Sequence, residues 1–248
     1  QLQKMIRQGK AQVDGRTVTD PGFSCDTDSA RLTLNGQAVD GRLTRHVMLH
    51  KPAGLLTAAR DKKQPTVMDL LPESYAAIGC MPVGRLDKDT TGIVVAAKDA
   101  YTASKLAGKV EKTYIALLCG ALPQESGTVD APIRRVDPVH ILREVSADGR
   151  RAVTHYRQLQ QKDGYTLARF RLETGRTHQI RVHMASLGHP IAGDEVYGPA
   201  KSKVDLGGQS LHARCLTFLH PSDGQPRLVE SELPAYFRNF LDKLERMS

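Results

Sequence analysis

The residues best suited to chemistry are concentrated in segment 84–92, which reads Gly-Arg-Leu-Asp-Lys-Asp-Thr-Thr-Gly. It carries two carboxylates, Asp87 and Asp89, directly ahead of the apolar, β-branched run 93–97. A short run of this kind predicts a buried strand, so the carboxylates are expected at the entrance to that strand. A carboxylate held there can serve as a nucleophile or as a general base.

Other interpretations of this segment are less favourable. A calcium-binding loop would place Lys98 at its twelfth position, where a bidentate Glu is required. A phosphatase nucleophile of the form Asp-x-Asp-x-Thr would use Asp87, Asp89 and Thr91, but that motif should follow an apolar strand, and a Gly-Arg pair interrupts one here. A surface turn without function would not need the Arg-Leu-Asp sequence, although it stays an alternative when these residues are taken alone.

A second polar segment covers residues 173–184 and reads Glu-Thr-Gly-Arg-Thr-His-Gln-Ile-Arg-Val-His-Met. Its apolar spacing predicts a helix over 178–187 with Thr177 as the N-cap. The free N–H groups and the positive dipole end of a helix start favour an anion, so we expect Arg176 to contact a phosphate there. His178 and His183 do not share a helix face, which favours scaffold hydrogen bonds over a zinc site.

Arg181 lies beside the apolar face of this predicted helix, where a half-buried guanidinium must meet an anion. A carboxylate is the least costly partner, and Asp87 is the candidate. Such a pair would hold the carboxylate ionised, ready to act as a nucleophile or base. Tyr114, at the start of an apolar strand in the sequence Glu-Lys-Thr-Tyr, is either a core side chain or a ring that stacks on a base.

Most of the chain shows β-strand patterns. Residues 1–45 predict a small separate unit, with a short helix at 2–8 and two hairpins whose turns are Asp14-Gly15 and Asn35-Gly36. Strands dominate over 46–248, and the clearest helix there is an amphipathic run at 233–247. Because strands and helices do not alternate in a βαβ rhythm, the sequence predicts an α+β fold with a mixed or antiparallel sheet.

The composition is that of an ordinary folded protein with excess positive charge. The 248 residues include 35 Lys or Arg and 27 Asp or Glu, for a net charge of +8. Segment 143–183 holds nine of the basic residues and four acids, a surplus suited to a polyanion such as RNA. The four cysteines form no Cys-x-x-Cys pair and the apolar runs are short, so we expect a cytoplasmic protein without disulfides, metal or membrane spans. No surplus apolar helix demands a partner, which favours a monomer.

Three motifs, taken in their order and spacing, carry a resemblance to a known family. They are segment 84–92, Glu-Lys-Thr-Tyr at 111–114, and Glu-Thr-Gly-Arg-Thr-His-Gln-Ile-Arg-Val-His at 173–183, which is followed by Gly-His-Pro-Ile-Ala-Gly-Asp-Glu-Val-Tyr-Gly. From residue 46 to the end, the chain resembles the RluA/RsuA class of ribosomal-RNA pseudouridine synthases, with features of both branches. Residues 1–45 resemble an S-four-type RNA-binding domain that lacks its first helix.

The resemblance implies a cofactor-free isomerisation of uridine to pseudouridine in RNA, with ribosomal RNA as the expected substrate and transfer RNA as the alternative. Asp87 would be the essential catalytic residue, Arg181 its ion-pair partner, and Tyr114 the ring that stacks on the uracil and assists proton removal at carbon 5. The expected RNA- or substrate-binding residues are Arg85, which would help to displace the target base, and Arg176, Thr177, His178 and Gln179. The competing hypothesis is a non-catalytic RNA-binding factor of the ribosome, which would not need Asp87.

Overall fold

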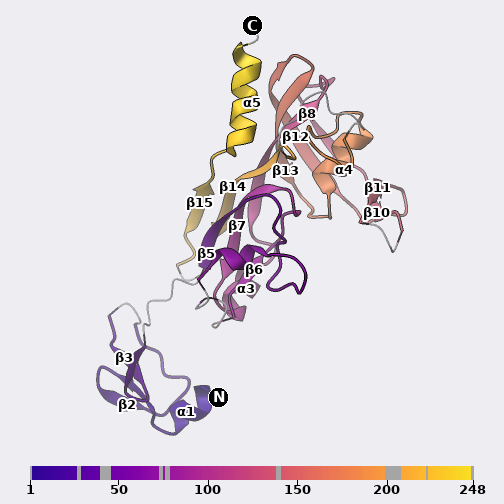
Figure 1. Ribbon diagram of the computed structural model, residues 1–248. Coiled ribbons are helices and arrows are strands. Elements are labelled where there is room, and N and C mark those ends of the chain that lie inside the picture. The colour runs from indigo at the N-terminus through magenta and orange to yellow at the C-terminus, as the bar shows by residue number, and fades with distance from the viewer. Residues whose placement is uncertain are drawn as a thin grey trace. The chain divides into compact units, whose positions relative to one another are not determined.

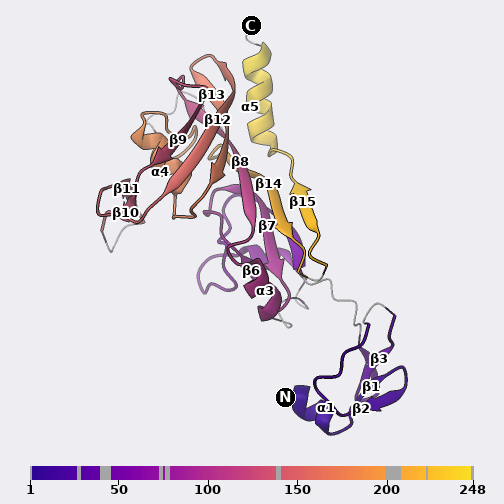
Figure 2. The same ribbon diagram turned by 180° about the vertical axis from the view of Figure 1, so that it is seen from behind.

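The computed structural model describes residues 2–26, 29–39, 46–72, 75, 79–137, 141–198, 208–221 and 223–246. The chain divides into two compact units, Gln1–Thr44 and Arg45–Ser248, and each is considered by itself (Figures 1 and 2). Within these described ranges, no helix is both long enough and apolar enough to cross a bilayer.

The N-terminal unit is a short helix followed by a small sheet. Helix α1 (Leu2–Arg7) precedes a sheet with the order β2-β1-β3-β4, whose strands are β1 (Ala11–Val13), β2 (Arg16–Val18), β3 (Leu32–Leu34) and β4 (Gln37–Val39). Both expected hairpins are present, because Asp14-Gly15 and Asn35-Gly36 adopt the positive φ angles that a tight primed turn requires. No described residue of this unit is buried, as expected for so few residues. The resemblance to an S-four-type domain stays a prediction.

The larger unit is built on a nine-stranded mixed sheet with the order β5-β7-β14-β8-β13-β12-β9, in which β15 also pairs with β14 and β6 with β7. Strand β14 (Leu211–Leu219) is central: it runs parallel to β7 (Thr91–Ala97) and antiparallel to β8 (Glu111–Cys119). The other strands are β5 (His46–Lys51), β6 (Met81–Val83), β9 (Ser126–Asp130), β12 (Val153–Lys162), β13 (Tyr165–Leu172) and β15 (Pro226–Glu230). A separate hairpin pairs β10 (Ile133–Arg135) with β11 (Arg143–Val145).

Few helices accompany this sheet, so the expected α+β fold with a mixed sheet is confirmed. Those in the described part of this unit are the 3-10 helix η1 (Val67–Leu70), α3 (Ala100–Leu106), α4 (Gln179–Ser186) and α5 (Ala235–Arg246). Helix α4 packs Ile180 onto one face of the sheet, in the same core as Phe170 of β13. Helix α5 packs Phe237 and Phe240 onto the other face, against Ile115 of β8. The cleft described next lies on the α4 side, because it shares Ile180 with this core.

Gly92 allows β7 and β14 to approach each other closely. Its φ is 119°, and a Cβ atom at this position would collide with the backbone of Ala213. Any residue with a side chain would therefore push the two strands apart. The glycine that ends segment 84–92 is required by packing, and it fixes the strand that follows Asp87 against the centre of the sheet.

Candidate active site

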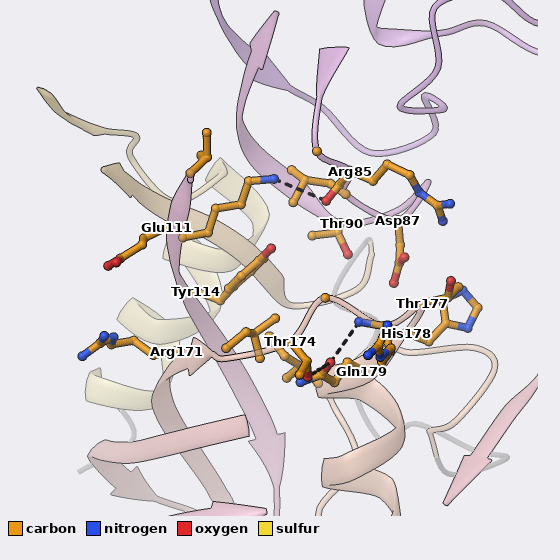
Figure 3. Close-up of a pocket in the computed structure, with 18 of the residues that line it drawn as sticks. Arg85, Asp87, Thr90, Glu111, Tyr114, Arg171, Thr174, Thr177, His178 and Gln179 are labelled. Carbon is orange, nitrogen blue, oxygen red and sulfur yellow. Dashed lines mark hydrogen bonds between the residues drawn. The ribbon is translucent and has the colours of Figure 1, made fainter. Parts of the chain in front are cut away.

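The larger unit contains a cleft of about 790 Å³ whose walls come from segments far apart in the sequence. One wall is the loop ahead of β7, another is the start of β8, and a third is the turn between β13 and α4 (Figure 3). All eight residues singled out from the sequence line the cleft: Arg85, Asp87, Tyr114, Arg176, Thr177, His178, Gln179 and Arg181. The structure thus brings them together, while the roles expected of them stay predictions.

The loop that carries Asp87 is held on both sides of this residue. Thr57 Oγ1 donates to the carbonyl of Leu86 at 2.9 Å and accepts from the N–H of Leu86 at 3.2 Å. The amine of Lys51 donates to three carbonyls at 2.6 to 3.0 Å, those of Pro52, Lys88 and Thr90. Asp87 therefore points into the cleft from a fixed support, with 18% of its side chain exposed (Figure 3).

Lys51 is a buried cation whose importance the motifs do not reveal. Its side chain is fully buried. Burial lowers the pKa of Lys51 to about 8, against the opposing effect of the charges on Asp89 and Asp87. While it is protonated, its three N–H donors match the three carbonyls one to one. The sequence shows only a lysine at the end of an apolar strand, which does not say where the amine goes.

Replacing Lys51 with Met is expected to lower the free energy of unfolding by at least about 2 kcal/mol, because buried carbonyls lose their donor. Lys88 offers a matched control: its carbonyl accepts from Lys51, but its own side chain is exposed. Urea unfolding of Lys51→Met and Lys88→Met measures the difference. Equal stability of the two variants would show that the loop does not depend on the buried amine.

Arg181 contacts Asp87, as the sequence suggests, but its main partner is a different carboxylate. Its Nη1 lies 3.4 Å from Asp87, whereas Nε and Nη2 donate to the two oxygens of Asp194 at 2.7 and 2.8 Å. The expected ion pair between Arg181 and Asp87 is thus present, and Asp194, which the sequence does not single out, pairs with Arg181 at shorter distances. The physical reason is the geometry of the guanidinium, which forms a stronger pair when two parallel N–H groups meet both oxygens of one carboxylate.

Asp194 is the functional residue that the motifs do not assign. Its side chain is 0% exposed, and it also accepts from the backbone N–H groups of Val196 and Tyr197. Burial would raise the pKa of Asp194, but the hydrogen bonds and charge of Arg181, with the two N–H groups, outweigh burial and lower it. The ionised carboxylate thus holds Arg181 with Nη1 toward Asp87. The acid is visible in Gly-Asp-Glu-Val-Tyr, but the sequence does not report its distance from Arg181.

The turn before α4 differs from the expected N-cap. Thr177 does not cap the helix: the N-cap is His178, which has a left-handed conformation with a φ of 59° and makes no side-chain cap bond. Gln179 closes the turn instead, through four side-chain hydrogen bonds of 2.8 to 3.0 Å with Thr174, Arg176, Val153 and Thr154. Because these bonds use the capacity of the amide, the side chain of Gln179 positions the turn, and the ligand contact expected of this residue stays a prediction.

The other residues of the turn face the cleft or its rim. The exposed Arg176 donates Nε to the carbonyl of Arg151 at 2.9 Å, and within the described part of the chain its Nη groups have no partner. His178 Nδ1 lies 2.8 Å from the hydroxyl of Tyr197. Burial lowers the pKa of His178 despite the opposing charge of Asp87, so the imidazole is uncharged at neutral pH. The turn therefore offers one free guanidinium to an anion.

Tyr114 projects from β8 on the side of the cleft opposite His178 (Figure 3). Lys112, on the same strand, also lines the cleft. Burial, aided by the charge of Asp87, raises the pKa of Tyr114 far above its usual range, so the phenol stays protonated. Lys112 donates to the carbonyl of Arg85 at 3.3 Å, and burial lowers the pKa of Lys112 to about 8. No carboxylate pairs with Lys112 among the described residues. This wall thus presents a neutral phenol and an available cation.

The cleft suits a ligand with phosphate groups and a flat ring. Lys112 and Arg176 supply positive charge for phosphates, Tyr114 supplies an aromatic face, and the carboxylate of Asp87 lies beside it. His183 is a scaffold residue as expected, with ring nitrogens 2.9 Å from Thr154 Oγ1 and from the carbonyl of Ala131. In the part of the chain that is described, no three His, Cys, Asp or Glu side chains converge as they would around a metal ion.

Comparisons with known proteins identify related chains. A family model described as RNA pseudouridylate synthase matches residues 45–186. An RNA pseudouridine synthase of Chloroflexus aurantiacus is 43% identical over 209 residues, which cover 79% of this chain and 66% of that protein. The ribosomal large subunit pseudouridine synthase D of Nitrosomonas europaea is 42% identical, over 76% of this chain and 59% of that protein. The chain thus spans less than two thirds of the length of these two relatives.

Two further matches cover a larger share of the related protein. The ribosomal large subunit pseudouridine synthase D of Xanthomonas campestris pv. campestris is 35% identical, over 100% of this chain and 85% of that protein. The solved structure of human RNA Pseudouridylate Synthase Domain Containing 4 gives a TM-score of 0.65 at 25% identity, over 82% of this chain and 91% of that one. On the family model and the Xanthomonas match, the chain belongs to the RNA pseudouridylate synthase family.

Proposed function

We propose that this protein converts uridine to pseudouridine in RNA, with Asp87 as the catalytic residue. The observation that carries the proposal is the Asp87 carboxylate, 3.4 Å from an arginine that a second, buried carboxylate holds in place. Family membership and the names of the relatives support the activity. Two relatives are named for the large ribosomal subunit, so ribosomal RNA is the first substrate to test and transfer RNA the second.

The proposed reaction exchanges one bond of the nucleoside for another. The glycosidic bond between sugar carbon 1′ and uracil nitrogen 1 breaks, and a bond from the same sugar carbon to uracil carbon 5 forms. Carbon 5 loses a proton and nitrogen 1 gains one, so product and substrate are isomers. Such a reaction needs a positioned carboxylate and a ring held against it. Asp87 supplies the carboxylate, acting on the sugar or on the base, and Tyr114 supplies the stacking face.

Tyr114 has a narrower role in this proposal than the resemblance alone implies. Because burial raises its pKa far above neutral, the phenol is not a base when RNA arrives. It stacks on the uracil and donates a hydrogen bond. Assistance with removal of the carbon 5 proton would require that RNA binding first lower this pKa.

The target base must leave its stack before it reaches Asp87, at a cost of a few kcal/mol. Arg85 is exposed at the rim of the cleft, where its guanidinium can take the place of the displaced base (Figure 3). Phosphate contacts by Arg176 and Lys112 offset the cost through the release of counterions.

Tritium release from uridine labelled at carbon 5 tests the proposal, because the isomerisation detaches that hydrogen. The substrates are unmodified transcripts of large-subunit and small-subunit ribosomal RNA, with transfer RNA in parallel. Release from any of them is the expected result. Binding of all three without release would favour the competing hypothesis of a non-catalytic RNA-binding factor.

The affinity for RNA is expected to fall about tenfold between about pH 7 and about pH 9, the size of one charged hydrogen bond. The pKa of Lys112 is lowered to about 8, so its positive charge is present below that pH and lost above it. Lys112→Arg keeps the charge, so its RNA affinity should change little with pH. Lys109→Arg, on the exposed loop nearby, should show the same pH dependence as the wild type. Fluorescence anisotropy with labelled RNA measures both. An equally steep profile in Lys112→Arg would assign the titration to another group.

A further inference from the structure

Three arginines lie on one face of β12 and β13. These two strands lie side by side in the sheet (Figures 1 and 2). Arg157 and Arg169 are direct cross-strand partners, and Arg171 lies two residues along β13, opposite His155. Directly opposed residues, and residues two apart on one strand, point to the same face of a sheet. All three arginines are exposed. We call Arg157, Arg169 and Arg171 the arginine row.

The arginine row carries an electrostatic cost for the folded protein when no ligand is bound. Like charges directly opposite each other destabilise a strand pair. Among the described residues, no carboxylate pairs with any member of the row. The next acid on β13's path, Glu173, is already held by Arg151 at 3.1 Å and by His155 at 2.9 Å. The row therefore carries three positive charges without an internal counter-ion.

Helix α5 covers the neighbouring part of this sheet face, while all three members of the row are exposed. It packs against Tyr165 and Leu167, which share a face of β13 with Arg169 and Arg171. Along this face, β13 is thus apolar beneath the helix and basic beyond it. This face is the one opposite α4, and its basic end reaches the rim of the cleft at the end of β13, where Arg171 lines the cleft together with Glu173 and Arg176.

We propose that the arginine row binds the phosphate backbone of the RNA strand that leaves the cleft. This proposal rests on the proposed function, which places RNA in the cleft. It adds a second RNA-binding surface that extends beyond the cleft. Guanidinium groups suit phosphates because they present paired N–H donors in one plane. A strand with its target nucleotide at Asp87 can pass around the end of β13 at Arg171 and onto the opposite face, where Arg169 and Arg157 lie. An acidic protein segment would match the charge but not the continuity with the cleft.

The test compares two double variants of the full chain that lose the same charge. Arg157→Gln/Arg169→Gln removes two members of the row, and Arg238→Gln/Lys243→Gln removes two exposed charges from α5. The probe is a fluorescein-labelled oligouridylate, and the measured quantity is the slope of log affinity against log salt. Losing two phosphate contacts on a single strand is expected to reduce the magnitude of the slope by about 1.4 in the row variant, with little change in the control. The rate of tritium release at saturating ribosomal RNA should equal that of the wild type.

Further measurements separate RNA binding from a structural role. Arg157→Lys/Arg169→Lys keeps the charges and should keep most of the salt slope. In Arg157→Gln/Arg169→Gln the repulsion between the charges is relieved, so its melting temperature should be unchanged or higher. Equal salt slopes in the Gln variant of the row and in the α5 variant would overturn the proposal. A Lys variant with a reduced salt slope and a lower melting temperature would also overturn it.

Two outcomes address the partner. The proposal would be overturned in favour of an acidic protein partner if Arg157→Gln/Arg169→Gln lost binding of polyglutamate but kept the wild-type salt slope for RNA. If the wild type releases no tritium but the slope falls as expected, the RNA-binding surface stands and only the proposed isomerase activity fails.

Discussion

Asp87→Asn is expected to reduce tritium release by roughly a thousandfold or more, the upper part of the range for loss of an acid–base group, while RNA binding is retained. The amide has nearly the shape of the carboxylate but cannot ionise, so it can act neither as a base nor as a nucleophile. Asp194 continues to hold Arg181 in the variant through its two hydrogen bonds, so the cleft keeps its geometry. Tritium release and anisotropy on the same RNA measure the two effects.

Asp89 provides the control for this experiment. It lies in the same loop, its side chain is exposed, and it is not among the described residues that line the cleft. Asp89→Asn makes the same change of charge and should release tritium at close to the wild-type rate. Loss of release in both variants would assign the effect to the charge of the loop, and release retained in Asp87→Asn would contradict the catalytic role.

Asp194→Leu is expected to lower the free energy of unfolding by about 3–5 kcal/mol, the cost of leaving a buried charge without its partner. The carboxylate is fully buried and accepts four hydrogen bonds, two of them from Arg181. Urea unfolding at neutral pH measures the loss. Because the pKa of Asp194 is lowered in the folded state, its contribution is present above the ordinary carboxyl range and is lost as the pH falls through the lowered value. Wild type and variant should therefore converge in acid.

Arg181→Met/Asp194→Leu separates stability from chemistry. Replacing both charges with apolar groups leaves no unpaired ion, so most of the stability lost in Asp194→Leu should return. Tritium release is expected to be absent in this double variant, because Asp87 has lost the cation beside it. Tritium release by this double variant would show that Arg181 has no part in the reaction. An unchanged free energy of unfolding in Asp194→Leu would contradict the buried ion pair.

The features predicted from the sequence are those that short patterns determine. Asp14-Gly15 and Asn35-Gly36 specify hairpins because few other pairs adopt two successive positive φ angles. The cleft residues can be predicted because three short motifs contain them. Thr177 was expected as an N-cap from its local preference alone, and the hydrogen bonds of Gln179 to the turn and to β12 overrode that preference.

The residues that support the site could not be predicted in the same way. Asp194 and Lys51 act through tertiary contacts, and their side chains give no periodic signal. A sequence shows that an acid or a lysine is present, but the choice between Asp87 and Asp194 as the partner of Arg181 depends on distances that only the folded sheet sets. The arginine row likewise depends on strand register, which places Arg157 opposite Arg169.

The position of β14 has a consequence for synthesis of the protein. This strand comes late in the chain, yet it lies between β7, which follows Asp87, and β8, which carries Tyr114. As a ribosome extends the chain from its N-terminus, β5 can pair with β7, and β8, β13, β12 and β9 can pair in that order. In the sheet of the described residues, however, the two groups of strands are joined through β14, which ends at Leu219. The sheet that carries both walls of the cleft is therefore complete only after Leu219 has been made, although the residues of both walls are made earlier.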